Sequence, residues 1–256
     1  MAFAYDLYTV GDNSRLDDLL LRRLKNIDQF QGARHELFAE ATCLRAGYTI
    51  ERENEQDRTR RHAEFTAIHR ATGQRISVEA KSRHRPGILG QPGTPPPPEK
   101  VSLRFGELVN DALRKNPPHP LAVFIDTNLP TRAAERLYGF QRLNRPVPPP
   151  MVSQNETSVT VTFPPLNPLV PSRIMATLLD RVCREHGGVD PYALLVFTNH
   201  PHHYAAPDEI DPRKHLLSVT PQQAPPGVTH AEAVLALHSA ANLYGNIPNQ
   251  FPAARG

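Results

Sequence analysis

The chain has 256 residues, of which 39% are hydrophobic and 27 are proline, and its formal net charge is only +3. This length can bury a sizeable core, while no apolar run approaches the ~20 residues of a membrane span. Together with an N-terminal stretch that lacks the basic start and apolar core of a signal peptide, these features exclude a membrane-embedded protein and predict a cytoplasmic one.

Hydrophobic periodicity and turn residues predict alternating helices and strands. In chain order they are helices over 17–27 and 33–46, strands over 48–50, 62–70 and 74–81, a helix over 101–115, a strand over 120–127, an edge strand over 158–163, a helix over 171–186, a strand over 192–199 and a helix over 231–244. A hairpin followed by helix-separated buried strands implies a mixed α/β sheet with helices on both faces. We expect a single domain over 1–256, with an N-terminal helical extension (1–30), a core (31–204) and a C-terminal loop and helix (205–256).

The two cysteines, Cys43 and Cys183, fall in predicted helices and show no metal-binding spacing. They are typical of buried thiols in a reducing compartment.

The most informative feature is the predicted hairpin over 62–81. Glu79 and Lys81 lie two residues apart on its second strand and therefore share a face. A turn centred between Ala71 and Thr72 pairs residues whose numbers sum to 143, which sets Glu64 opposite Glu79 with Cβ atoms about 5 Å apart. A one-residue slip of this register would move Glu64 to the other face.

Two carboxylates at this separation repel each other unless a cation lies between them. A hard divalent ion with oxygen ligands, Mg²⁺ or Mn²⁺, fits that geometry. Lys81 beside them is suited to stabilise developing negative charge or to orient a water molecule.

Positive charge is concentrated around this hairpin. Between residues 58 and 85 the chain carries a net +6, against −3 for the remainder. The basic residues are Arg58, Arg60, Arg61, Arg70, Arg75, Lys81, Arg83 and Arg85. A basic rim around an acidic pair suits a phosphate-containing polymer, although a solvated hairpin surface would show the same charge pattern.

These residues and their order resemble the PD-(D/E)xK nuclease superfamily, which has the restriction-endonuclease-like fold. The triplet Glu79-Ala80-Lys81 matches the family's Glu-x-Lys, and Glu64 takes the place of its first acid. The segments 32–36 and 46–48 look like the family's first helix and the glycine that follows it. The chain departs from the pattern at Glu64, where the family usually has aspartate after proline, and this departure bears on activity.

The resemblance implies roles for individual residues. Glu64, Glu79 and the carbonyl of Ala80 would hold Mg²⁺ or Mn²⁺, and Lys81 would position the attacking water. Glu36 would tune the site or hold a second ion or water, and Glu40, one helical turn on, is an alternative to it. The residues expected to contact backbone phosphates are Ser82, Arg83 and Arg85.

The resemblance also implies a metal-dependent endonuclease acting on DNA in restriction, defence or repair, with a homodimer as one form. Two alternatives stay open. One is a nuclease-like module that binds nucleic acid or a protein partner without cleaving it. The other is a zinc hydrolase built on His200, His202 and His203, which follow the strand over 192–199.

Overall fold

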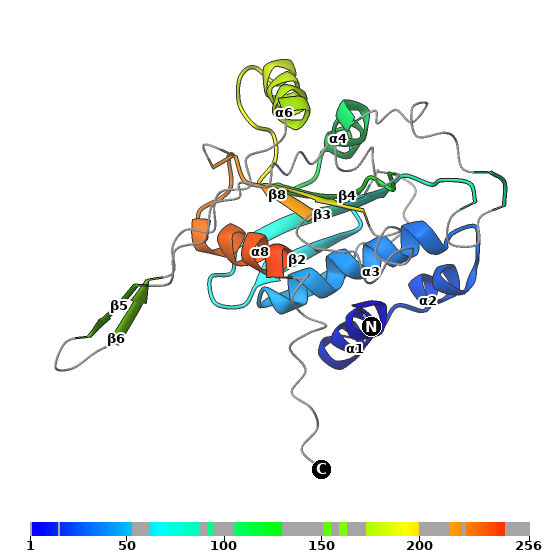
Figure 1. Cartoon of the computed structure of the whole chain (residues 1–256), viewed down its shortest axis with the longest axis horizontal. Coiled ribbons are helices and arrows are strands. Elements are labelled where there is room, and N and C mark those ends of the chain that lie inside the picture. Colours follow the sequence, from blue (N-terminus) through cyan, green and yellow to red (C-terminus); the bar gives the residue numbers. More distant parts are fainter. Residues whose placement is uncertain are drawn as a thin grey trace, which may run out of the picture.

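The computed structural model describes residues 2–14, 16–52, 62–87, 92–94, 105–129, 151–154, 159–162, 173–199, 216–221 and 224–243. Within them, six strands form one mixed sheet in the order β1-β2-β3-β4-β7-β8 (Figure 1). These strands are β1 (Tyr48–Arg52), β2 (Phe65–His69), β3 (Arg75–Ser82), β4 (Leu121–Asp126), β7 (Leu194–Thr198) and β8 (Leu216–Val219). The expected mixed α/β architecture is therefore confirmed.

The sheet has antiparallel edges and a parallel centre. The pairs β1–β2, β2–β3 and β7–β8 are antiparallel, whereas β3–β4 and β4–β7 are parallel. The parallel strands β4 and β7 are buried along their whole length, in keeping with their continuous apolar runs. A separate antiparallel ladder joins β5 (Met151–Gln154) to β6 (Val159–Thr162).

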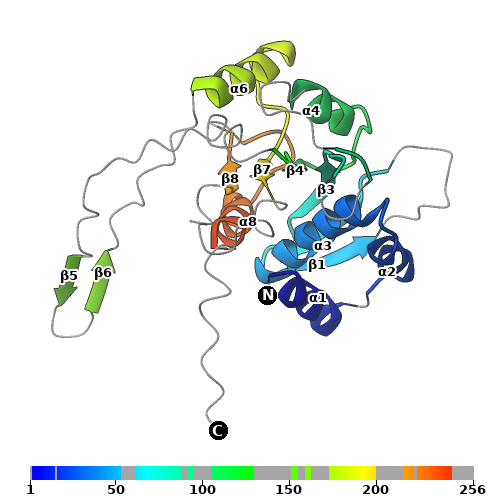
Figure 2. The same cartoon turned by 45° about the vertical axis from the view of Figure 1, so that its right-hand side comes forward.

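Helices cover both faces of the sheet (Figures 1 and 2). On one face lie α3 (Phe30–Arg45) and α8 (Ala231–Leu243), and on the other lie α4 (Phe105–Leu113) and α6 (Arg173–Glu185). A further layer packs on the outer side of α3 and consists of α1 (Ala2–Asn13) and α2 (Asp18–Lys25) (Figure 2).

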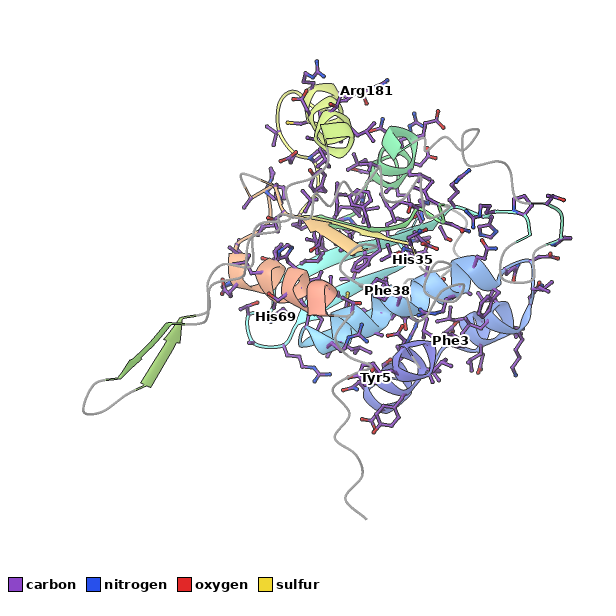
Figure 3. All side chains as sticks on the ribbon, viewed as in Figure 1. Phe3, Tyr5, His35, Phe38, His69 and Arg181 are labelled. Carbon is purple, nitrogen blue, oxygen red and sulfur yellow. The ribbon has the colours of Figure 1, made fainter. Side chains whose placement is uncertain are left out.

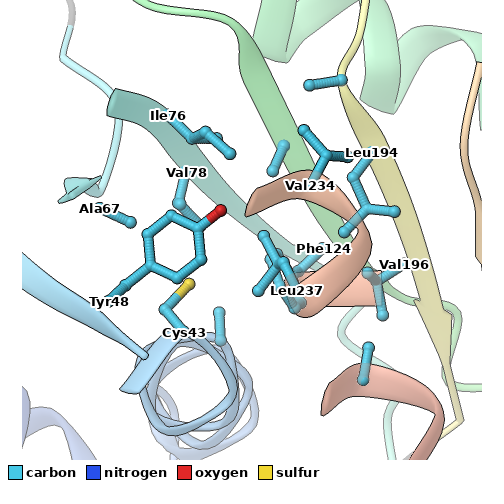
Figure 4. Packing of buried hydrophobic residues seen from close by; sticks show 14 of the residues in the cluster. Cys43, Tyr48, Ala67, Ile76, Val78, Phe124, Leu194, Val196, Val234 and Leu237 are labelled. Atoms are coloured by element: carbon cyan, nitrogen blue, oxygen red, sulfur yellow. The ribbon is translucent and has the colours of Figure 1, made fainter. Parts of the chain in front are cut away.

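The largest core cluster lies between the sheet and α3 and α8. There Phe38 of α3 packs edge-on against Phe124 of β4, with ring centroids 6.0 Å apart. Tyr48 of β1 is fully buried in the same cluster (Figure 4), and its hydroxyl donates a 2.7 Å hydrogen bond to the carbonyl of Ala233 in α8. This bond links the first strand to the last helix. Cys43, also in this cluster, is buried and free as predicted, whereas Cys183 on α6 is free but only partly buried.

The predicted elements agree with the observed ones apart from shifts at their ends. The helix predicted over 33–46 begins three residues earlier, at Phe30, because the segment through Gly32 continues into its first turn. It ends before Gly47, whose φ of +85° suits glycine. Three elements were not predicted, namely α1, β5 and β8. The charged segment 53–61 and residues 101–104 and 171–172 lie outside the described residues.

Candidate active site

The hairpin register places Glu64 beside Glu79. Phe65 pairs with Val78 and Thr66 with Ser77, so the predicted sum of 143 is confirmed. Glu64 immediately precedes β2, and its backbone N–H donates to the carbonyl of Val78 at 3.0 Å. The two acids therefore come together where β2 and β3 separate.

Glu79 is fully buried and is held by two lysines. Lys81 Nζ lies 2.6 Å from Glu79 Oε1, and Lys115 Nζ lies 2.7 Å from the same oxygen and 2.8 Å from Oε2. Lys115 Nζ also lies 3.9 Å from Glu64 Oε1. The ammonium group of Lys115 thus occupies the position of a shared counter-ion for the two carboxylates.

Lys115 was not predicted as a site residue. It follows the last turn of α4 and precedes a proline pair, and only the packing of α4 over the sheet brings it to β3. In the sequence it is a lysine at the end of an otherwise apolar helix face. Lysines are common at helix C-termini because they interact favourably with the helix dipole, so this position does not indicate a functional site.

Glu36 on α3 is the third acid of the site. Its carboxylate pairs with Arg23 of α2, with Arg23 Nη1 2.7 Å from Oε2. Burial, and next the negative charge of Glu64, raise the pKa of Glu36 to about 8, and the guanidinium of Arg23 only partly opposes this shift. Glu36 and Glu64 are therefore close enough to interact electrostatically.

The pKa of Glu64 is also raised, to about 6. Burial is the largest cause and the charge of Glu79 is the second, while Lys115 and Lys81 oppose them. This is the repulsion expected of paired carboxylates, partly relieved by neighbouring cations.

Glu40 has a different role. It is buried one turn after Glu36, and its two carboxylate oxygens accept hydrogen bonds from Arg52 Nε (3.1 Å) and Nη2 (2.7 Å) at the end of β1. This bidentate ion pair links α3 to β1. Both acids pair with an arginine, Glu36 with Arg23 and Glu40 with Arg52, but only the pKa of Glu36 is raised by the charge of Glu64.

The donor set suits a hard divalent cation. Glu64 and Glu79 present carboxylate oxygens around one position that already attracts an ammonium group, and Ala80, whose carbonyl is the predicted third ligand, separates Glu79 from Lys81 in β3. In the described part of the chain, no three His, Cys, Asp or Glu side chains are grouped closely enough to form a ready-made metal site. Lysine ion pairs balance the acids instead.

The three residues expected to contact phosphates lie at the end of β3. Ser82 Oγ donates to Asp126 Oδ2 of β4 at 3.5 Å, so this hydroxyl points across the sheet. Arg83 is half-buried, and its backbone N–H donates a hydrogen bond to the carbonyl of Asp126 in β4 (3.0 Å). Arg85 is buried. Burial lowers the pKa of both guanidinium groups.

The competing histidines, His200, His202 and His203, lie outside the described residues. The residue before them, Asn199, has a structural role. Its side chain accepts a hydrogen bond from the N–H of Leu129 (2.7 Å) and donates one to the carbonyl of Leu129 (3.0 Å).

No family model, no curated protein and no solved structure matches this chain. Among the described residues, no helix is both long and apolar enough to cross a membrane.

Proposed function

We propose that this protein is a divalent-metal-dependent nuclease that hydrolyses phosphodiester bonds, with DNA as the expected substrate, in restriction, defence or repair. The observation that carries the proposal is the meeting of Glu64, Glu79 and Lys81 where β2 and β3 separate, with Glu36 beside them. Carboxylates that can share a divalent ion, next to a lysine that can orient a water, are the groups that metal-assisted hydrolysis needs.

The element order supports the restriction-endonuclease-like fold as part of this proposal. Helix α3 is followed by the antiparallel meander β1-β2-β3, then by α4 and by β4 parallel to β3. The same order of helix, three strands, helix and strand is expected of the family that the sequence resembles. Glu79 lies on β3, and Glu64 lies immediately before β2.

Each residue would have a defined task. Glu64 and Glu79, with the carbonyl of Ala80, would hold Mg²⁺ or Mn²⁺, which supplies charge to polarise the phosphodiester and acidify a water. Lys81, held 2.6 Å from Glu79, would position that water and neutralise charge on the phosphate. Glu36 would accept a hydrogen bond from the water or balance a second cation.

Lys115 favours a second candidate, a nuclease-like module that binds its partner without cleaving it. Its ammonium already neutralises Glu79 and approaches Glu64, so the acids have a counter-ion within the protein. In that case the wild-type protein would bind nucleic acid with the same affinity in EDTA and in Mg²⁺ and would not cut it.

Cleavage of a substrate panel tests the proposal. Purified protein is incubated with supercoiled plasmid, linear duplex, single-stranded DNA and RNA, in Mg²⁺, Mn²⁺ or EDTA. We expect metal-dependent cleavage of DNA that Glu79→Gln and Lys81→Ala each reduce by about 10²-fold or more.

Arg181→Met is the matched control, because Arg181 is an exposed cation on α6 (Figure 3). Its partner is Glu185, four residues on in the same helix. Cleavage that survives both active-site substitutions in folded protein, or that proceeds equally in EDTA, would refute the proposal. Metal-independent binding without cleavage of any substrate would select the second candidate.

A further inference from the structure

After β3, the buried Arg85 and the half-buried Arg83 each have guanidinium nitrogens that are buried without an acceptor. Arg85 is only 8% exposed. Within the described part of the chain, Arg85 Nε and Nη1 and Arg83 Nη1 are buried nitrogens with no hydrogen-bond partner. Buried polar groups in folded proteins nearly always have partners, and an unpaired buried cation is costly. These donors therefore point to a ligand.

The charge around them is unbalanced. Burial and the neighbouring charge of Arg83 lower the pKa of Arg85, while Asp126 opposes that shift. The carboxylate of Asp126 is itself occupied, because it accepts hydrogen bonds from Ser82 Oγ (3.5 Å) and Thr198 Oγ1 (3.3 Å). Among the described residues, Asp126 is the acid whose charge acts on Arg85, against the like charge of Arg83, so an anion would balance the second guanidinium group.

Hydrogen bonds from the side chains of Gln31 and Asn128 hold the backbone of both arginines in place. Gln31, in the first turn of α3, accepts from the N–H of Arg85 (3.3 Å) and donates to the carbonyl of Arg85 (3.4 Å). Asn128 Nδ2 donates to Gln31 Oε1 (2.7 Å) and to the carbonyl of Arg83 (2.9 Å).

Asn128 has a φ of +42°, in the left-handed region, which asparagine enters more readily than most other non-glycine residues. Its side-chain hydrogen bonds to Gln31 and to the carbonyl of Arg83 hold it there. The segment is therefore built to hold the two arginines in place.

We propose that Arg83 and Arg85 form a binding site for a phosphate group. Guanidinium groups bind phosphate through paired, charge-assisted hydrogen bonds, and a dianion or monoanion would satisfy the unpaired donors. Arg83 lies two residues after Lys81, so a backbone phosphate of the nucleic acid is the expected source. That identification rests on the proposed function, whereas the site itself does not.

The first experiment measures thermal unfolding in potassium phosphate and in potassium chloride at equal ionic strength. We expect phosphate to raise the Tm of the wild-type protein by about 3 °C relative to chloride. Arg85→Met should lose this gain and should melt higher than wild type in chloride, because it removes a buried unpaired charge. Arg83→Met provides a second test if Arg85→Met does not fold, and Arg181→Met is the exposed control.

The second experiment measures binding of single-stranded and duplex DNA by fluorescence anisotropy in EDTA, which prevents cleavage. Loss of one phosphate contact should weaken binding by about tenfold and reduce the salt slope by about one in Arg85→Met. Arg85→Lys should recover part of the affinity, because it restores the charge and not the paired geometry.

The outcomes separate the possibilities. Phosphate-specific stabilisation with unchanged DNA binding supports the site and assigns it to a free phosphate. Equal behaviour of wild type, Arg85→Met and Arg181→Met in both experiments overturns the inference, even if the protein cleaves DNA. If the protein binds phosphate through these arginines but shows no metal-dependent cleavage, the phosphate site stands and the proposed nuclease function is refuted.

Discussion

Lys115 Nζ lies 2.7 Å from Glu79 Oε1, although 36 residues separate the two side chains in the sequence. The same ammonium group lies 3.9 Å from Glu64 Oε1. A divalent ion held by these two carboxylates would compete with Lys115 for the same oxygens. Lys115 is therefore expected to weaken metal binding.

Lys115→Met should raise the affinity for Mn²⁺ on the order of tenfold, because the ion no longer displaces a like charge. Isothermal titration calorimetry at pH 8 measures this change. Arg114→Met is the control, since Arg114 is the exposed neighbour and pairs only with Asp111 among the described residues. Equal or weaker binding by Lys115→Met would show that Lys115 does not occupy the metal position.

Glu36 should make the metal-free protein less stable as the pH rises. Its pKa is raised from 4.5 to about 8 in the folded chain, so the folded state holds a proton that the unfolded state has released. The resulting stability is present at low pH and is lost as the pH rises through this range. Glu64, whose pKa is about 6, adds to the loss mainly below pH 6.

Glu36→Gln should therefore flatten the dependence between pH 6 and 7.5. The slope of the free energy of unfolding should become less negative by up to about 1.4 kcal/mol per pH unit. Urea unfolding of both proteins in EDTA at several pH values measures it. Parallel curves for the two proteins would indicate that Glu36 is already ionised at neutral pH.

Glu40 should prove structural. Glu40→Gln breaks the bidentate ion pair with Arg52, and we expect a loss of about 1–3 kcal/mol in the free energy of unfolding. Metal affinity should stay close to wild type, because this carboxylate is engaged by Arg52. Chemical denaturation gives the free energy of unfolding of this variant, and calorimetry gives its metal affinity. A strong loss of metal binding with unchanged stability would assign Glu40 to the metal site.

Asp6 should be important for stability. It is fully buried in α1 and pairs with Arg34 (3.1 Å) and Arg45 (2.9 Å) of α3. Asp6→Ala leaves Arg34, itself 2% exposed, without this counter-ion, and breaking a buried pair in this way costs about 3–5 kcal/mol. Asp12→Ala, at an exposed position of the same helix, should change the free energy of unfolding by less than about 0.5 kcal/mol.

The hairpin could be predicted from the sequence because its determinants are local. The alternation of 62–70 and 74–81 and the short turn between them favour the register that sets Glu64 opposite Glu79. The three turn residues also allow a slip by one or two residues, and the observed pairing of β2 with β3 excludes it. The buried strands β4 and β7 were equally clear, since their continuous apolar runs have few other interpretations.

The ion pair of Lys115 with Glu79 and the hydrogen bond between Gln31 and Asn128 could not be predicted, because both depend on how distant elements pack. Nothing local distinguishes Lys115 from other lysines at helix ends, and Asn128 meets Gln31 only after β4 has paired beside β3. The choice between Glu36 and Glu40 also depended on tertiary structure, since Arg52 selects one of two acids on nearly the same edge of α3.

The proposed reaction requires a divalent ion at Glu64 and Glu79, so we would measure Mn²⁺ binding before any other property. The electron paramagnetic resonance signal of free Mn²⁺ gives the number and affinity of bound ions at pH 8. We predict at least one ion per chain for wild type, with binding weakened by tenfold or more in Glu79→Gln and unchanged in Arg181→Met. Equal Mn²⁺ binding by wild type and Glu79→Gln, or no binding by folded wild-type protein, would show that these acids do not form the metal site of a nuclease.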